Sequence, residues 1–238
     1  MAAADVSENG SNDDDDPARV VAVDPESALV WGSDYNLRRL VVQDWQFAFE
    51  RADPRPPNYW TSRYNRGERI DPAEFPEVLH DNWKQGGKEP PKDLPGIFMG
   101  TGGVKIVTEE VKSLLEQFNL GQTHFVPVKL ITRFKKEVEG KFFYLNIAEL
   151  RRVIDPEESA TITRNRGGNA WMFNRQTFTE SGDLSRETDF AVTGLPPDSI
   201  DLWMDPLIKG SIFATARLAK ALNALDTGEF ALFPCRTV

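Results

Sequence analysis

Two stretches of this chain follow the same pattern and align without a gap: TEEVKSLLEQFNLGQTHFVP at Thr108–Pro127 and TARLAKALNALDTGEFALFP at Thr215–Pro234. Each begins with a threonine that can cap a helix, continues with apolar residues at helical spacing, and then has a glycine and a β-rich run. A short apolar run precedes each stretch. The pattern therefore predicts two strand–helix–strand units, at 103–128 and 210–235, which correspond position by position in a single alignment.

The two predicted helices each carry one apolar stripe, which they must bury against another layer. Gly121 and Gly228 are placed to end them, because glycine adopts the left-handed conformation at little cost. Duplication of one unit and convergence on the same caps and stripes both explain the likeness, and both stay open. The stripe residues are Val111, Leu114, Leu115 and Phe118 in the first helix, and Leu218, Ala221, Leu222 and Leu225 in the second.

Further elements are predicted outside these units. Lys141–Ile147 is expected to form a hairpin with Phe125–Phe134. A short helix is expected at Ala148–Ile154, ended before Pro156, and helical turns at 72–76. The proline-rich segment 51–96 is predicted to be rich in loops. Other strands are predicted at Ala18–Val23, Leu40–Val42, Ala160–Thr163, Trp171–Phe173 and Phe190–Thr193.

These elements predict an α/β or α+β fold, in which a mixed β-sheet is covered by the two similar units and the N-terminal region is rich in loops. Residues 1–16 hold six acids and no base, out of a net charge of −9, so residues 1–18 are predicted to be a disordered acidic tail. Residues 19–238 are predicted to form a single α/β domain. The single cysteine and the lack of a signal peptide or apolar span favour a cytoplasmic protein.

The usual catalytic and binding motifs are missing from the sequence. The glycines of Gly100–Gly103 precede a strand, whereas phosphate-binding loops need them before a helix. Cys235 and His124 align with Val128 and Ala231 in the other unit, which indicates sheet positions. We therefore predict no catalytic, cofactor-binding or metal-binding residue.

Nucleic-acid binding is a minor alternative. Several arginines occur near Trp171, but the acidic balance of the chain argues against it, so no nucleic-acid partner is predicted. These arginines are Arg151, Arg152, Arg164, Arg166 and Arg175.

One motif precedes the second unit: Asp201, Trp203, Asp205 and Pro206 in the order Asp-x-Trp-x-Asp-Pro. We expect Asp205 to cap a turn that begins with Pro206, and Trp203 to be buried against the sheet. Together with SIFATARLAKAL and FALFPCRTV, the motif resembles the C-terminal signature of a bacterial immunity-protein family of polymorphic toxin systems. The resemblance covers about residues 80–238 and includes GGVKIVTEEVKSLLE, FVPVKL and YLNIAELRRVIDPEES.

The resemblance implies a non-enzymatic cytoplasmic protein that binds and neutralises a cognate toxin, without a cofactor or a membrane. A homodimer stays open. Two other classes also stay open: a structural or regulatory interaction module, and an enzyme with a site built from scattered carboxylates. Aromatic residues in loop-like sequence are candidates for contact with a partner. They are Trp31, Tyr59, Trp60, Tyr64 and Trp83.

Overall fold

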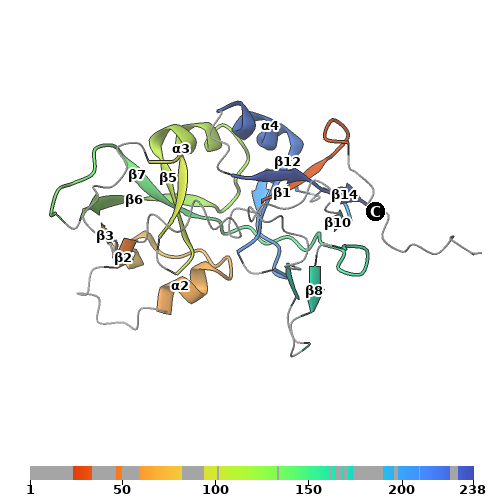
Figure 1. Ribbon diagram of the computed structural model, residues 1–238, viewed down its shortest axis with the longest axis horizontal. Coiled ribbons are helices and arrows are strands. Elements are labelled where there is room, and N and C mark those ends of the chain that lie inside the picture. Colours follow the sequence, from red (N-terminus) through yellow and green to blue (C-terminus); the bar gives the residue numbers. More distant parts are fainter. Residues whose placement is uncertain are drawn as a thin grey trace, which may run out of the picture.

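The computed structural model describes residues 24–33, 47–49, 59–81, 94–100, 102–132, 134–160, 162–164, 168, 171–173, 190–195, 198–208, 210–225 and 230–238. The predicted tail, the predicted strands Ala18–Val23 and Leu40–Val42, Gly228 and Trp83 lie outside these residues. The architecture is a mixed α+β fold built mainly from sheets, which confirms the predicted fold class (Figure 1). No helix in the described ranges has the length and apolar character that crossing a membrane requires.

The first sheet has six strands in the order β2-β3-β6-β7-β5-β4. Helix α3 (Glu109–Leu115) connects the parallel strands β5 and β6, and β7 lies antiparallel between them. The predicted hairpin is confirmed by the pairing of β6 with β7. The strands are β2 (Phe47–Phe49), β3 (Val78–Asp81), β4 (Ile97–Gly100), β5 (Val104–Thr108), β6 (His124–Ile131) and β7 (Phe142–Asn146).

The second sheet has four strands in the order β11-β12-β1-β13. Helix α4 (Ala216–Ala224) connects the parallel strands β12 and β13, and β1 lies antiparallel between them. After β13 the chain continues into β14 (Arg236–Thr237), which pairs in parallel with β10 (Ala191–Val192). The strands of the sheet are β1 (Val30–Ser33), β11 (Leu202–Trp203), β12 (Ile212–Thr215) and β13 (Leu232–Pro234).

The two sheets share one pairing scheme, in the same alignment that matches Thr108 with Thr215 in the sequence. β1 occupies in the second sheet the place that β7 occupies in the first, and β11 occupies the place of β4. The matched pairs, first sheet before second, are Thr108–Phe142 with Thr215–Val30, Val107–Phe143 with Ala214–Trp31, Pro127–Phe143 with Pro234–Trp31, and Ile97–Val107 with Leu202–Ala214.

This correspondence continues beyond β6. β3 pairs in parallel with the end of β6, and β10 pairs in parallel with β14 at the corresponding positions. On the other edge of β3, β2 pairs with it in antiparallel. At the corresponding edge of β10, Ile154 forms an antiparallel bridge with Val192. Each unit therefore has the same order of pairing from one edge to the other. Whether the units arose by duplication stays a prediction. The matched pairs are Val78–Lys129 with Ala191–Arg236, Leu79–Leu130 with Val192–Thr237, and Phe49–Leu79 with Ile154–Val192.

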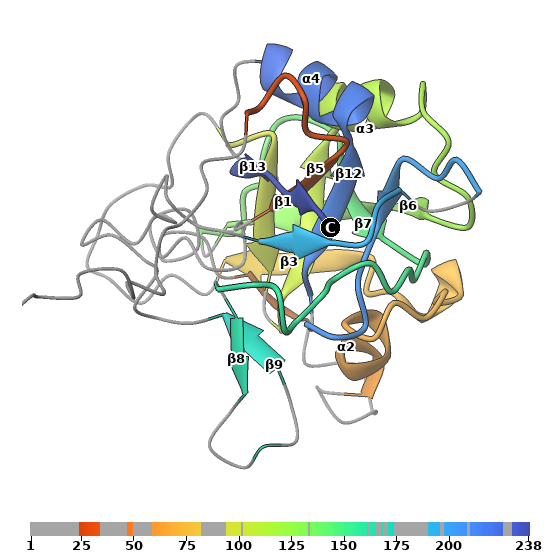
Figure 2. The same ribbon diagram turned by 90° about the vertical axis from the view of Figure 1, so that its right-hand side faces the viewer.

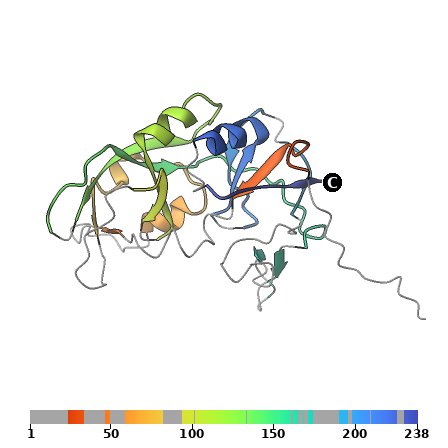
Figure 3. The ribbon, with the colours of Figure 1, turned by 45° about the horizontal axis from the view of Figure 1, so that its top comes forward.

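Helices α3 and α4 lie side by side on one side of the molecule (Figure 1; Figure 3). Their apolar stripes contribute to one core that contains residues of both units, including Val111 and Leu115 from α3 and Leu218 and Leu222 from α4. The opposite face of each sheet has a separate cluster, one around Tyr144 and the other around Trp203. The shared core therefore holds the two units together.

The segments that precede β3 and β10 differ between the units. In the first unit, helix α2 (Tyr59–Tyr64) and a 3-10 turn at Pro72–Glu74 lie between β2 and β3. In the second, a hairpin of β8 (Ile162–Arg164) and β9 (Trp171–Phe173) lies between Ile154 and β10. Both segments lie on the side of the molecule opposite α3 and α4 (Figure 1; Figure 2).

The helix predicted at Ala148–Ile154 is wrong. This segment is extended, and the backbone N–H groups of Val153 and Ile154 donate to Oδ2 of Asp205 at 2.7 and 2.8 Å. A helix would direct these groups to carbonyls four residues earlier. A buried carboxylate distant in sequence therefore replaces the local hydrogen bonds that a helix needs.

The two threonine caps also differ. The Oγ1 atom of Thr108 accepts a hydrogen bond from the N–H of Val111, as predicted. Thr215 makes no such cap, and its hydroxyl instead donates to Oδ1 of Asp201 at 2.6 Å. A threonine therefore precedes both helices, but its side chain binds the helix backbone in the first unit and Asp201 in the second.

Glycines take the left-handed conformation in two turns, and for these turns the sequence predicts this conformation only at Gly121. Gly102 and Gly103 have φ values of 81° and 80° and turn the chain from β4 into β5. Gly121 has a φ of 55°, but α3 ends earlier, at Leu115. Gly121 therefore belongs to the turn before β6 and does not itself end the helix.

Candidate functional site

Helix α2 and the loop that follows it carry a polar surface. We define the α2 surface as the side chains of Tyr59, Ser62, Arg63, Arg66, Glu68 and Glu74. Tyr59 is 50% exposed, and the guanidinium carbon of Arg63 lies 5.9 Å from the centre of its ring. An aromatic ring and an arginine in this arrangement are typical of residues that contribute much of the energy at protein interfaces.

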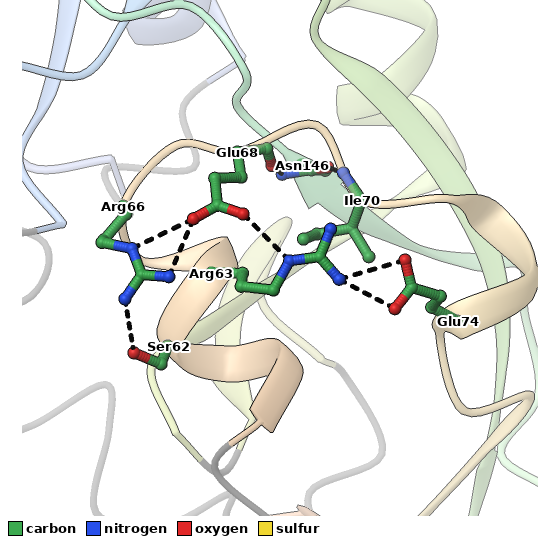
Figure 4. A network of polar contacts seen from close by, with 7 residues as sticks. All are labelled: Ser62, Arg63, Arg66, Glu68, Ile70, Glu74 and Asn146. Atoms are coloured by element: carbon green, nitrogen blue, oxygen red, sulfur yellow. Dashed lines mark hydrogen bonds and ion pairs between the residues drawn. The ribbon is translucent and has the colours of Figure 1, made fainter.

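Two arginines of the α2 surface form a connected set of ion pairs (Figure 4). Arg63 contacts Glu68 and Glu74, with N–O distances of 2.9 Å in both pairs. Arg66 contacts Glu68 at 2.8 Å and donates to the hydroxyl of Ser62 at 3.1 Å. Hydrogen bonds from Arg63 and then Arg66 hold the pKa of Glu68 below its ordinary value, so this carboxylate stays ionised.

The loop of the α2 surface is fixed from below by a buried amide. Oδ1 of Asn146 on β7 accepts from the N–H of Ile70 at 2.9 Å, and its Nδ2 donates to the carbonyl of Glu68 at 3.1 Å. Nε2 of His124 lies 3.1 Å from the carbonyl oxygen of Ile70. Three backbone polar groups of the loop thus have partners on the first sheet, which attach the loop to it.

Helix α2 is attached to the same sheet by Tyr64. The N–H of Lys105 donates to the hydroxyl oxygen of Tyr64 at 3.0 Å, and this hydroxyl donates to the carbonyl of Leu145. The hydroxyl therefore bridges two neighbouring strands, β5 and β7. Burial raises the pKa of Tyr64 far above its ordinary value, so the hydroxyl keeps the proton that it donates.

The four proposed aromatic residues that the structure describes do not gather on one surface. Trp60 and Tyr64 are only 2% exposed, and Trp60 packs against Phe75 and Tyr144 with ring centres 5.2 and 5.9 Å apart. They belong to the core, which leaves Tyr59 as the exposed member on α2. Half-buried Trp31 lies on β1 of the second sheet. For Tyr59 and Trp31, contact with a partner stays a prediction.

Lys105 is a buried cation next to α2. Its side chain is fully buried, and Nζ lies 5.6 Å from the centre of the Tyr64 ring without a hydrogen-bond partner in the described chain. Burial lowers the pKa of Lys105 to about 8. Its counterpart in the second sheet, in the alignment that matches Thr108 with Thr215, is the apolar core residue Ile212.

Asp201 of the sequence motif is a buried junction between the two units. Its carboxylate accepts from the N–H of Asn119 at 2.9 Å, from the hydroxyl of Thr215, and from Nε of Arg217 at 2.6 Å. Burial alone would raise its pKa, but the hydrogen bonds from Arg217, Thr215 and Asn119 outweigh burial and lower it. The carboxylate thus joins the turn after α3 to the start of α4.

The rest of the motif is also engaged in structure. Oδ1 of Asp205 accepts from the N–H of Leu207 at 2.8 Å, which closes the turn that begins at the exposed Pro206. Trp203 is fully buried and stacks on Phe213 with ring centres 6.1 Å apart. The contacts of Asp201, Trp203 and Asp205 are thus contacts within the fold.

Cys235 is buried and Arg151 is paired, whereas Arg166 and Arg175 lie outside the described residues. Cys235 is buried in the cluster around Trp203, and burial raises the pKa of its thiol well above the ordinary value. Arg151, one of the arginines of the nucleic-acid alternative, forms ion pairs with Glu149 and Asp198. Among the described residues there is no group of three or more His, Cys, Asp or Glu side chains that could hold a metal ion.

Several residues of the α2 surface were not among the contact residues predicted from the sequence. Arg63, Glu68 and Glu74 were not proposed, and neither was the supporting Asn146. The signal for them was an alternation of charges in RYNRGERIDPAE, in which bases are followed by acids at short distances. Asn146 gives no such signal, because only the fold brings its amide to a loop that is distant in sequence.

Comparison with known families gives one match. The model of a family described as "Immunity protein family (Imm11)" matches residues 33–193, which is more than half of the chain. The matched range includes the proline-rich segment, α2 and the β8–β9 hairpin, whereas the motif from Asp201 to Pro206 lies beyond it. No curated protein matches this sequence.

Proposed function

The chain belongs to the immunity protein family Imm11, and on this premise we propose that it binds and neutralises a cognate bacterial toxin without catalysing a reaction. The family match is the observation that carries the proposal. The toxin would belong to a polymorphic toxin system, and the protein would act in the cytoplasm of the cell that it protects. A homodimer is a further hypothesis that the binding experiment below also tests.

We propose the α2 surface as a contact site for the toxin. It lies within the matched range, and it presents an exposed tyrosine beside an arginine. Its loop is held by Asn146 and its helix by Tyr64, so little conformational entropy is lost when a partner binds. Such preorganisation favours tight binding, which a protective protein needs.

The test uses the toxin domain encoded beside this gene, made inactive by substitution so that it can be purified. Tyr59→Ala and Arg63→Ala are expected to weaken binding about 10-fold or more each, measured by isothermal titration calorimetry. Co-expression with the active toxin tests protection directly, because cells carrying these variants should grow less than cells carrying the wild type. The mass of the complex in multi-angle light scattering reports a dimer.

The matched control is Lys220→Ala, an exposed position on α4 on the opposite side of the molecule. It should bind and protect like the wild type. A wild-type protein that neither binds the toxin nor protects against it would contradict the proposed function. Normal binding by both α2 variants would instead leave the function standing and move the contact site elsewhere.

A further inference from the structure

The β8–β9 hairpin and α2 are the segments by which the two units differ most. Helix α2 lies in the chain between the edge strand β2 and β3. The hairpin lies at the corresponding place in the second unit, between Ile154 and β10. Both lie on the same side of the molecule, away from α3 and α4 (Figure 1; Figure 2). A partner that covers the α2 surface therefore approaches the side on which the hairpin also projects.

The hairpin is fixed to the second unit on one face only. Ile162 is buried and Trp171 packs against the cluster around Trp203, whereas Thr163 and Met172 face the other way and are exposed. Arg164 is paired with Trp171 across the two strands. Two strands alone are marginal in water, so contact with the body of the protein accounts for the base of the hairpin.

Arg164 stacks on an aromatic ring and has only weak polar partners among the residues that the structure describes. Its guanidinium carbon lies 4.7 Å from the centre of the Trp171 ring. Its side chain is 59% exposed, its nearest carboxylate oxygen, on Glu157, is 4.0 Å away, and its hydrogen bond to the carbonyl of Gly168 is long, at 3.4 Å. An arginine has five N–H donors in a fixed plane, and among the described residues Arg164 uses them in a single hydrogen bond, to Gly168.

This arrangement is the reverse of that at α2. There, Arg63 and Arg66 are neutralised by Glu68 and Glu74 of the same chain. Arg164 has only one carboxylate partner among the described residues, the exposed Glu157 at 4.0 Å, and the ring that it stacks on reduces the entropy lost when it binds a closer one. A planar guanidinium matches a carboxylate with two parallel hydrogen bonds.

We propose that the β8–β9 hairpin is a second toxin-binding element, in which Arg164, held on Trp171, binds a carboxylate on the surface of the toxin. This inference rests on the proposed function. The toxin is then held at two points on one side of the immunity protein, by the α2 surface of the first unit and by the hairpin of the second. The matched family range includes both points.

The experiment measures the affinity of full-length variants for the inactivated toxin domain encoded beside this gene. Arg164→Ala is expected to weaken binding about 10-fold or more, and Arg164→Glu more strongly because it places two carboxylates together. Arg164→Lys keeps the charge but loses the planar fork, so it should bind like the alanine variant rather than like the wild type. Circular dichroism and the melting temperature check that each variant is folded.

Thr163→Ala and Met172→Ala are matched controls on the other face of the same hairpin. Both are expected to bind like the wild type. The proposal is overturned if all Arg164 variants bind normally while the wild type binds, or if only the control face matters. It is also overturned if Arg164 variants keep toxin binding but lose another activity of the wild type. The two activities to measure are binding of single-stranded RNA and self-association. Failure of the wild type to bind the toxin contradicts the proposed function itself.

Discussion

The first and second sheets pair their strands in the same register, but they obtain their central antiparallel strand in different ways. In the first sheet, β7 comes from the residues that follow β6. In the second, the equivalent strand is β1, which lies near the start of the chain, whereas its neighbour β12 lies near the end. The central strand of the first sheet therefore comes from a neighbouring part of the sequence, whereas that of the second sheet comes from a distant part.

This difference shows that the two units are not independent. β1 pairs with both β12 and β13, so the second sheet lacks its centre without residues 30–33. The helices add a shared core, and Asp201 adds polar contacts between the turn after α3 and the start of α4. We expect one cooperative unfolding transition for the chain rather than two.

The largest effect is expected from removing β1. Deletion of residues 1–33 should abolish the folding of the second unit, because β12 and β13 lose their common neighbour and Val30 is lost from the cluster around Trp203. Deletion of residues 1–18, the predicted tail, is the control and should leave the melting temperature unchanged. Calorimetry and near-ultraviolet circular dichroism measure both. Two separate transitions in the longer deletion, with an intact second unit, would refute the dependence on β1.

A smaller loss is expected at Asp201. Its counterpart in the first unit is Gly96, because the carbonyls of these two residues accept from the N–H groups of Thr215 and Thr108. Asp201→Ala should lower the free energy of unfolding by about 3 kcal/mol, because the N–H of Asn119 and the hydroxyl of Thr215 lose their acceptor. The depressed pKa means that this contribution is present above the unfolded pKa of the carboxyl and is lost as the pH falls through the folded value. Urea unfolding at pH 7 and pH 3 measures it.

The control for Asp201 is Asp198→Ala, which removes an exposed ion pair with Arg151. Such a pair contributes about 1 kcal/mol or less. Equal losses for the two variants would show that the buried junction has no special weight.

A gain in stability, rather than a loss, is expected from replacing Lys105. The second sheet has the apolar residue Ile212 at the equivalent position. Lys105→Met should raise the free energy of unfolding at pH 7 by about 2 kcal/mol, since a buried ammonium that has no hydrogen-bond partner among the described residues is replaced by an apolar chain. The folded pKa of about 8 lies below the unfolded value, so the unfolded state binds more protons between them.

The stability of the wild type should therefore rise relative to Lys105→Met as the pH increases from 7 to 9.5, by about 2 kcal/mol. Taking the difference between the two proteins removes the contribution of Cys235, which both contain. A constant difference over this range would show that Lys105 does not titrate there.

The smallest effect concerns the helix caps. Thr108→Ala should lower the free energy of unfolding by about 1 kcal/mol, because the N–H of Val111 loses its acceptor. Thr215→Ala should lower the free energy of unfolding by more than Thr108→Ala does, since the hydroxyl of Thr215 donates a hydrogen bond to the buried Asp201. Equal values in chemical denaturation would mean that the two threonines have the same role despite their different partners.

Much of the fold followed from local sequence, and the errors have a common cause. Strands β5, β6, β7, β12 and β13 and helices α3 and α4 were predicted because they depend on periodicity within a few residues, whereas β2, β3, β4, β11 and α2 were not predicted. The helix predicted at 148–154 failed because Asp205, which is distant in sequence, binds its N–H groups. The place of β1 could not be predicted either, since so short a strand carries no sign of which strands it joins.

The candidate site was less accessible to sequence reasoning. Aromatic residues in loop-like sequence were proposed, but Trp60 and Tyr64 of α2 turn inward, and only the helical geometry separates them from Tyr59. The ion pairs of Arg63 link it to Glu68 and Glu74 through a loop whose path depends on Asn146. Such contacts require the folded chain and have no periodic pattern.

The position of β1 has a consequence for how the protein is made. A ribosome synthesises β1 early, but its neighbour β12 begins only at Ile212, close to the end of the chain. The first sheet has all of its strands once Asn146 has left the exit tunnel, so it can fold while translation continues. The nascent β1 must wait until the last part of the chain has emerged, and during that interval its apolar side chains are available to chaperones.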